Sequence, residues 1–115
     1  MQKFNSVDEL ANSIKPINPV YCIRPNSIKL ACKWFKTNFP GKVLYAVKTN
    51  PNEKVIRYIG ESGINRFDVA SIDEIKLIKK IIPKARIYYM NTVKSREHIQ
   101  EAYFNHNIRD FVLDT

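Results

Sequence analysis

One lysine stands where its amine could act as a nucleophile. Lys48 follows an apolar run, residues 43–47, and precedes a polar turn, residues 49–52. A lysine amine reacts only when unprotonated, and a position where a buried strand meets a polar turn lowers the cost of losing the charge while keeping the amine accessible. The position fits a lysine that forms a Schiff base. It also fits a lysine at a strand end whose charged group simply extends into water, which is common.

The elements that must position this lysine follow a repeated pattern. Apolar runs rich in β-formers alternate with helical patterns, and the runs occupy residues 20–23, 43–47, 66–69, 86–90 and 110–113. From residue 43 onward they recur about every 20 to 23 residues, which is typical of right-handed βα units with a parallel sheet. Periodicity alone does not decide between an open doubly wound sheet and a (β/α)8 barrel, because both use the same unit.

Helix start and stop signals lie between the predicted strands. A helix beginning at Asn26 should end at Pro40, a second should span about 52–62, and a third should begin at a capping box, Ser71 to Glu74. A fourth should begin near Ser95, and residues 1–18 should contain a short capping helix beginning at Ser6. The buried stripes are expected to be formed by Ile28, Leu30, Ala31, Trp34, Phe35, Val55, Ile56, Ile59, Ile75, Ile78, Ile82, Ile99, Ala102 and Tyr103.

Composition narrows the class of protein. A chain of 115 residues with 44% hydrophobic residues and only 3 glycines can bury one modest core, which argues against a disordered or fibrous chain. The formal charge of +8 is compatible with nucleic-acid binding, but the basic residues are spread along the chain and no binding motif accompanies them. We therefore expect that the protein does not bind nucleic acid.

Neither a membrane location nor a metal site is expected. The chain has no apolar run long enough to span a membrane and no signal-peptide core, so we expect a cytoplasmic protein. Cys22 and Cys32 have no metal-ligand spacing with His98 or His106, so they are expected to be reduced, buried thiols.

A family resemblance emerges from several segments together. The chain from about residue 19 onward resembles the amino-terminal part of the pyridoxal-phosphate decarboxylases of ornithine, lysine, arginine and diaminopimelate. The segments that carry the resemblance are Tyr45-Ala46-Val47-Lys48-Thr49-Asn50, Phe67-Asp68-Val69-Ala70-Ser71 with Glu74, Ile87-Tyr88-Tyr89-Met90-Asn91, and Arg109-Asp110-Phe111-Val112-Leu113-Asp114.

The resemblance implies an α/β fold, namely the first half of a (β/α)8 barrel that binds pyridoxal 5'-phosphate. Residues 1–18 would form the capping helix and lead-in, and residues 19–115 the amino-terminal half of the barrel. A complete barrel needs about 250 residues. The two outermost strands would therefore present unpaired edges, and the inner face would lack the side chains of the missing strands.

The resemblance also assigns roles to individual residues. Lys48 would hold the cofactor as a Schiff base and later move protons, and Asp68 would be the carboxylate beside it. Asp68 could instead cap a turn. Glu74 matches a further cofactor-binding carboxylate, although its capping-box role explains it equally well. Asn91 could line the pocket or turn the chain, and Asp114, at the end of the fourth strand, is a weaker candidate.

The implied activity is decarboxylation of a basic amino acid, ornithine or lysine, in polyamine biosynthesis. Residues 67–74 resemble ornithine and lysine decarboxylases more than diaminopimelate decarboxylases. The family's phosphate-binding glycine-rich loop, pyridine-nitrogen acid and carboxy-terminal β domain are missing, and full-length members form homodimers. We therefore expect a truncated or split-gene fragment that is inactive alone. The alternatives are a non-catalytic homologue that binds an intact decarboxylase subunit and a relic of gene decay.

Overall fold

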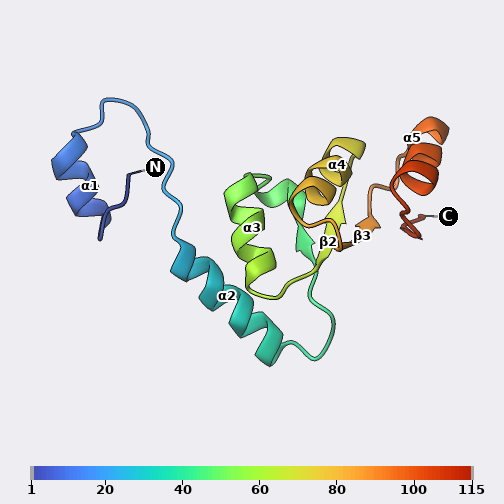
Figure 1. Ribbon diagram of the computed structural model, residues 1–115, viewed down its shortest axis with the longest axis horizontal. Coiled ribbons are helices and arrows are strands. Elements are labelled where there is room, and N and C mark those ends of the chain that lie inside the picture. Colours follow the sequence, from blue (N-terminus) through green and yellow to red (C-terminus); the bar gives the residue numbers. More distant parts are fainter. Residues whose placement is uncertain (1, 115) are drawn as a thin grey trace.

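The computed structural model describes residues 2–114 (Figure 1). Helices and strands alternate from the second helix onward. The α-helices are α1 (Val7–Ile14), α2 (Pro25–Asn38), α3 (Glu53–Glu61), α4 (Ile72–Ile81) and α5 (Arg96–Gln100). The strands are β1 (Tyr45–Ala46), β2 (Arg66–Val69), β3 (Arg86–Tyr89) and β4 (Asp110–Phe111). A 3-10 helix, η1 (Val47–Thr49), follows β1, and a π-helix, η2 (Glu101–Asn105), continues α5.

The helix starts follow the side-chain caps that the sequence predicts. Ser6, Asn52, Ser71 and Ser95 are the N-cap residues of α1, α3, α4 and α5, and each side chain accepts a hydrogen bond from a backbone amide in the first turn. These bonds satisfy amide groups that have no partner within the helix. The helices predicted to begin at these four positions are confirmed.

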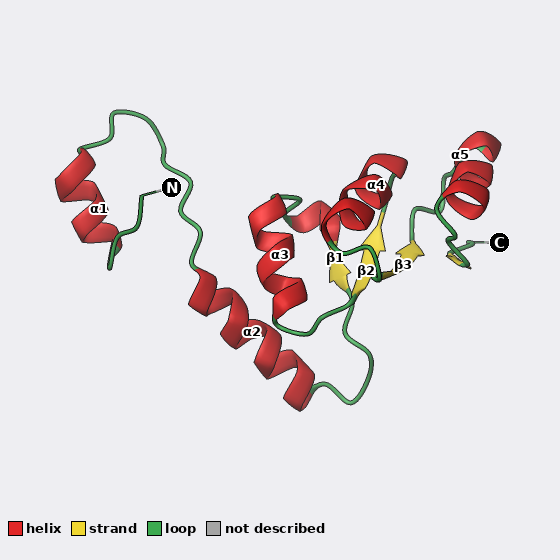
Figure 2. Cartoon of the chain, in the orientation of Figure 1, coloured by secondary structure: helices red, strands yellow, loops and turns green. Residues whose placement is uncertain are grey.

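The strand order distinguishes between the two folds that periodicity left open, a doubly wound sheet and a (β/α)8 barrel. The four strands form one sheet in the order β1-β2-β3-β4, and every neighbouring pair is parallel. In a doubly wound sheet the strand order reverses, whereas here each strand pairs with the next one along the chain. The connections between parallel strands are right-handed. When each one leads to the next strand on the same side, all of the connecting helices lie on one face of the sheet. This is the arrangement of half a (βα)8 barrel (Figure 2).

The core lies between these helices and the outer face of the sheet. Phe67 and Val69 of β2 are fully buried, and Ile87 and Tyr89 of β3 are almost so. They meet the predicted apolar stripes of α3 and α4, of which Val55, Ile56, Ile59, Ile75 and Ile78 are buried. Gly63 ends the α3 region at a φ of 87°, a left-handed conformation that glycine adopts without strain. The second and third helix predictions are thus confirmed.

Several predicted details are wrong. Residues 20–23 form no strand, and the predicted runs 43–47 and 110–113 shorten to two residues each. On α2, Leu30 is 68% and Trp34 60% exposed, because the helix packs against α3 along one side only. Ala31 and Phe35, which were also expected to be buried, are exposed as well. In the last helix Ala102 is buried but Ile99 and Tyr103 are exposed, since the wide turn of η2 changes the helical repeat.

The amino-terminal arm lies apart from the sheet (Figure 1). Helix α1 has no buried residue. The radius of gyration is 17.1 Å, against about 13 Å for a compact domain of this length. None of the helices within residues 2–114 combines the length and the apolar character needed to cross a membrane.

Candidate functional site

Lys48 lies beyond the carboxyl end of β1, within the 3-10 turn η1. The backbone amide of Asn50 donates to the Val47 carbonyl at 3.1 Å and closes this turn. The Lys48 side chain is exposed, whereas Val47 beside it is fully buried. The expectation of a lysine at the very end of a strand is therefore wrong in detail: β1 ends two residues earlier, and the amine lies in an exposed turn.

The turn that carries Lys48 is held by neighbouring side chains. The Tyr45 hydroxyl donates to the Asn50 carbonyl at 3.1 Å, and the Asn50 side chain donates to the Tyr21 hydroxyl. The Asn52 amide donates to the Asn50 side-chain oxygen at 3.1 Å. Burial raises the pKa of the Tyr45 phenol, so it remains a hydrogen-bond donor at neutral pH. These hydrogen bonds fix the backbone around Lys48, whose side chain is exposed.

Asp68 projects from the inner face of β2. It pairs in register with Ala46 of β1 and Tyr88 of β3, while its neighbours Phe67 and Val69 are buried against the helices on the other face. The side chain is half-buried, and its carboxylate has no hydrogen bond or ion pair to another of the described residues. An unpaired carboxylate on the strand next to Lys48 is available to interact with a cationic group.

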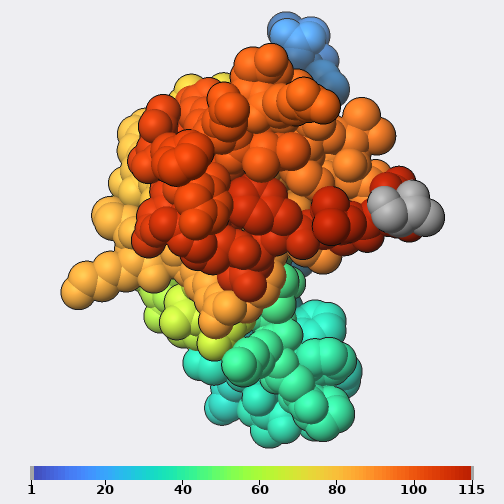
Figure 3. Space-filling model, turned by 90° about the vertical axis from the view of Figure 1, so that its right-hand side faces the viewer, coloured from blue at the N-terminus to red at the C-terminus, as the bar shows by residue number. Residues whose placement is uncertain are grey.

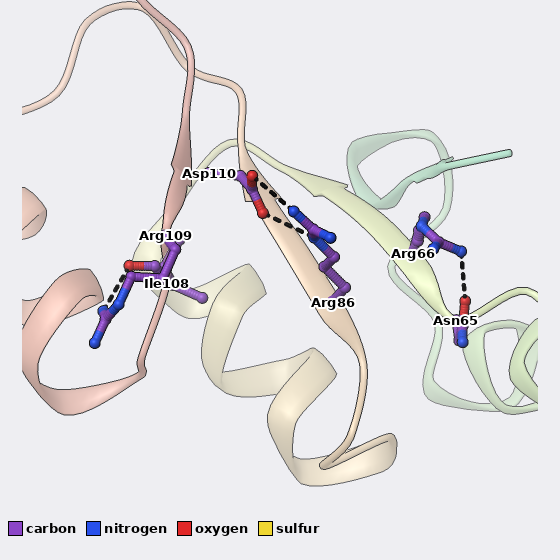
Figure 4. Close-up of polar contacts among 6 residues, drawn as sticks. All are labelled: Asn65, Arg66, Arg86, Ile108, Arg109 and Asp110. Carbon is purple, nitrogen blue, oxygen red and sulfur yellow. Dashed lines mark hydrogen bonds and ion pairs between the residues drawn. The ribbon is translucent and has the colours of Figure 1, made fainter. Parts of the chain in front are cut away.

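The inner face also carries the charged side chains of Arg66, Arg86 and Asp110 (Figure 4). Arg86 of β3 and Asp110 of β4 point toward one another and form two hydrogen bonds, at 3.0 and 3.1 Å. The guanidinium of Arg86 lowers the pKa of the Asp110 carboxyl, chiefly through this hydrogen bond. Arg86 also lies 5.3 Å from the Tyr88 ring centre. Arg66 donates to the Asn65 side chain at 3.2 Å, and its Nε atom is buried without a partner among the described residues.

Glu74 and Asn91 both bind the backbone of Ala70, directly after β2. The Ala70 amide donates to Glu74 Oε2 at 2.7 Å, and the Asn91 side-chain amide donates to the Ala70 carbonyl at 3.2 Å. The Glu74 amide in turn donates to Ser71 Oγ at 3.2 Å, which is the serine half of the predicted capping box. The glutamate half differs from the prediction, because the Glu74 carboxylate accepts from the amide of Ala70, one residue before the N-cap Ser71. The two side chains are thus brought together through the loop that follows β2.

Lys94 is a residue whose contacts the sequence did not predict. Its ammonium donates to the Asn91 carbonyl and, at 2.8 Å, to the Val112 carbonyl, which connects the loop after β3 with the segment after β4. It also lies 5.6 Å from the ring centre of Tyr89. Burial and the nearby negative charge of Glu74 raise the pKa of the Tyr89 phenol. No local pattern marks a lysine that caps carbonyls of two separate loops.

The strand ends therefore form an open, polar shelf rather than a closed pocket. The structure places Lys48, Asp68, Glu74 and Asn91 around the ends of β1, β2 and β3, and no hydrogen bond or ion pair among the described residues joins Lys48 to Asp68. Asp114 is exposed beyond β4, which ends at Phe111, so it does not end that strand as expected.

An apolar hollow, but no cluster of metal ligands, is present within residues 2–114. A hollow of about 340 Å³ lies between α2 and α3 and is lined mainly by apolar side chains. Neither Lys48 nor Asp68 lines it. Within the same residues, no three His, Cys, Asp or Glu side chains gather as a metal site would require. Cys32 is buried as expected, whereas Cys22 is exposed.

The fold is half of a (βα)8 barrel, a class in which enzymes carry their active sites at the carboxyl ends of the strands. Residues 25–115 match the family described as pyridoxal-dependent decarboxylase, pyridoxal binding domain. The chain belongs to this family.

Individual relatives agree with this assignment. A diaminopimelate decarboxylase of Aquifex aeolicus is 33% identical over 99 residues, which are 84% of this chain and 23% of that protein. The ornithine decarboxylase structure from Entamoeba histolytica has a TM-score of 0.71 and 30% identity, covering 79% of this chain and 27% of that one. The lysine decarboxylase structure from Selenomonas ruminantium has a TM-score of 0.79 at 19% identity and covers 100% of this chain and 30% of its own, which supports the fold. The chain thus spans about a quarter to a third of these relatives.

Proposed function

We propose that this chain is the amino-terminal half of the cofactor-binding barrel of a decarboxylase that acts on a basic amino acid and uses pyridoxal 5'-phosphate. Residues 1–18 would be the lead-in, and residues 19–115 the barrel half. The proposal rests on two features of a chain of this family: an exposed lysine amine in η1, which directly follows β1, and a carboxylate, Asp68, that has no partner among the described residues on the neighbouring strand β2.

The residues present fit the aldehyde end of the cofactor. Lys48 is reachable from solvent on a fixed backbone turn, and a free amine there can attack an aldehyde carbon. The negative charge of Asp68 would hold a protonated nitrogen in place on the neighbouring strand. When bound, the cofactor would supply the electron sink for loss of carbon dioxide.

Glu74 and Asn91 would act by positioning the loop after β2 against the cofactor. Both bind Ala70, one through its amide and the other through its carbonyl, so the loop is held from two sides. Lys94 would support this arrangement by holding the loops after β3 and β4 together. These contacts would fix the positions of the loops at the strand ends, and the side chains of Glu74, Asn91 and Lys94 would not act as catalysts.

The proposed substrate is ornithine or lysine, and the proposed role is polyamine biosynthesis in the cytoplasm. Residues 67–74 support this choice because they resemble the corresponding segment of ornithine and lysine decarboxylases. A diaminopimelate decarboxylase is nevertheless among the relatives, so substrate assays must include all three amino acids.

Covalent labelling tests the proposal. Incubation with pyridoxal phosphate and reduction by borohydride should label Lys48 in preference to the other twelve lysines. Lys48→Arg should remove this label, whereas the matched variant Lys84→Arg, at an exposed site, should keep it. Uniform labelling of all exposed lysines would contradict a cofactor role for Lys48. Release of carbon dioxide from any of the three amino acids by the 115-residue chain would contradict the need for a carboxy-terminal β domain.

A further inference from the structure

Asn50, which follows Lys48 by two residues, closes the turn that carries the lysine. Its backbone amide donates to the Val47 carbonyl at 3.1 Å, and its own carbonyl accepts from the Tyr45 hydroxyl at 3.1 Å. Tyr45 packs against the hydrophobic core, and its ring contacts that of Phe67 edge to face. The backbone of Asn50 is therefore anchored to the core of the barrel half.

The side chain of Asn50 connects the turn to two further segments. Its oxygen accepts from the amide of Asn52, the N-cap residue of α3, at 3.1 Å, and its amide group donates to the Tyr21 hydroxyl. Tyr21 precedes Asn50 by 29 positions and belongs to the linker, residues 15–24, between α1 and α2. The backbone amide, the carbonyl and both ends of the Asn50 side chain thus all have partners, and one of these partners comes from the linker.

Tyr21 lies where the linker meets the barrel half. Residues 11–22 are all exposed, and the next residue, Ile23, is half-buried and packs against the core. Before Tyr21 the chain leaves the body of the molecule (Figure 1), and a blue segment near the amino terminus projects beyond the rest in Figure 3. At 63% exposure Tyr21 buries little apolar surface, so its contribution to the stability of the fold is small. Its hydroxyl nevertheless makes a specific contact with the turn.

The turn η1 depends on such contacts because it is short. It contains three residues, and a single helical turn fixes several backbone dihedral angles in return for one hydrogen bond. Its geometry must therefore be stabilised from outside, which the contacts of Asn50 do. A displacement of about 1 Å between reacting groups can slow a reaction about a hundredfold. The reactivity of Lys48 should consequently depend on how firmly Asn50 is held.

We propose that Tyr21 is a positioning residue for Lys48. Through the Asn50 side chain, the Tyr21 hydroxyl holds η1 in the arrangement from which Lys48 reacts with the aldehyde of pyridoxal phosphate. In this reaction the lysine nitrogen bonds to the aldehyde carbon and one water molecule leaves. The inference rests on the proposed function, since it assumes that Lys48 is the reacting amine. It extends the site to the linker, which contributes through Asn50 and not by contact with the cofactor.

Removal of one hydroxyl group tests the proposal. Tyr21→Phe keeps the ring but removes the acceptor of the Asn50 hydrogen bond. After brief incubation with pyridoxal phosphate and reduction of the C=N bond by borohydride, Lys48 should carry about two- to tenfold less label relative to the other lysines, which is the fold-change that one hydrogen bond contributes. Hydrogen exchange of the Asn50 amide should accelerate even without the cofactor, while the urea midpoint should not change measurably. Tyr103→Phe, at a 42% exposed tyrosine on η2, should alter none of these quantities.

A double-mutant cycle tests whether Tyr21 acts through Asn50. Asn50→Ala removes both side-chain contacts and should lower the label on Lys48 more than Tyr21→Phe does. Adding Tyr21→Phe to Asn50→Ala should lower the label no further. Additive losses would overturn the proposal, because Tyr21 would then act by another route. An equal loss of label in Tyr103→Phe, or a fall in the urea midpoint of Tyr21→Phe, would overturn it as well.

The wild-type chain separates this inference from the proposed function. Uniform labelling of the exposed lysines in the wild type would contradict the role of Lys48, and this inference would be overturned with it. Preferential labelling of Lys48 that Tyr21→Phe leaves unchanged would overturn the positioning role of Tyr21 alone, and the proposed function would stand.

Discussion

The two faces of the sheet differ in what they are built from. On the face toward the helices, Phe67, Ile87 and Tyr89 are at most 3% exposed and form the centre of the core. On the inner face, Asp68, Arg86 and Tyr88 lie in the same strands and remain partly or fully exposed. Alternation along each strand therefore separates apolar packing from polar chemistry. Stability should reside on the first face and binding on the second.

Substitution of a core residue should produce the largest effect. Phe67→Ala removes a fully buried ring from the outer face, and it should lower the free energy of unfolding by about 3 to 5 kcal/mol. The matched change on the inner face, Tyr88→Ala, should cost about 1 kcal/mol or less. Urea unfolding followed by far-ultraviolet circular dichroism measures both. Equal losses would show that the inner face also carries part of the core.

Removing the hydrogen bonds by which Lys94 connects the loops after β3 and β4 should have an intermediate effect. Lys94→Met removes the donor to two backbone carbonyls and should cost about 1 to 3 kcal/mol. Hydrogen exchange of the amides at 91–95 and 111–113 should accelerate more than that of β2. Lys84→Met, at an exposed site, is the control and should change neither quantity. If Lys94→Met leaves exchange at both segments unchanged, Lys94 does not tie the loops.

The ion pair on the inner face should give a small, pH-dependent effect. Arg86 holds the folded-state pKa of Asp110 below its ordinary value of 3.8, so the pair contributes its full stability above that pH. The contribution is lost as the pH falls through the lower, folded-state value. Asp110→Asn should therefore lower the urea midpoint at neutral pH and show a smaller further loss in acid. Asp114→Asn, at an exposed site beyond β4, should keep the wild-type acid profile.

Asp68→Asn should change stability least of all. The carboxylate has no partner among the described residues, so the free energy of unfolding should move by no more than about 0.5 kcal/mol. The same substitution should reduce labelling of Lys48 by pyridoxal phosphate, because the compensating charge is lost. A large loss of stability with unchanged labelling would reverse the assignment of the two faces.

Local signals in the sequence were sufficient to predict where most helices begin and which of their faces are buried. Serine and asparagine caps fixed four helix starts, and apolar stripes identified the buried faces of α3 and α4, since both depend on residues a few positions apart. The parallel sheet followed from the spacing of the strand runs. These predictions needed no information about distant contacts.

Features that depend on the surroundings were not predictable. The run at 43–47 has strand propensity throughout, but among the described residues β1 pairs only with β2, and it gives way to a 3-10 turn at Val47. The apolar residues of α2 look like a core stripe, yet α2 contacts the rest of the fold along one side, so Leu30 and Trp34 stay exposed. The positions of Lys48 and Lys94 depend on such contacts, which no local pattern encodes.

The consecutive strand order also bears on how the chain folds. Every strand pairs with the next one along the chain, so each pairing closes a segment of about twenty residues, and the entropy cost of closing each is similar. The β2–β3 pair has the longest register and can form first, after which β1 and β4 add at either side. Folding can therefore proceed outward from the middle by sequence-local steps, without waiting for contacts between the ends of the chain.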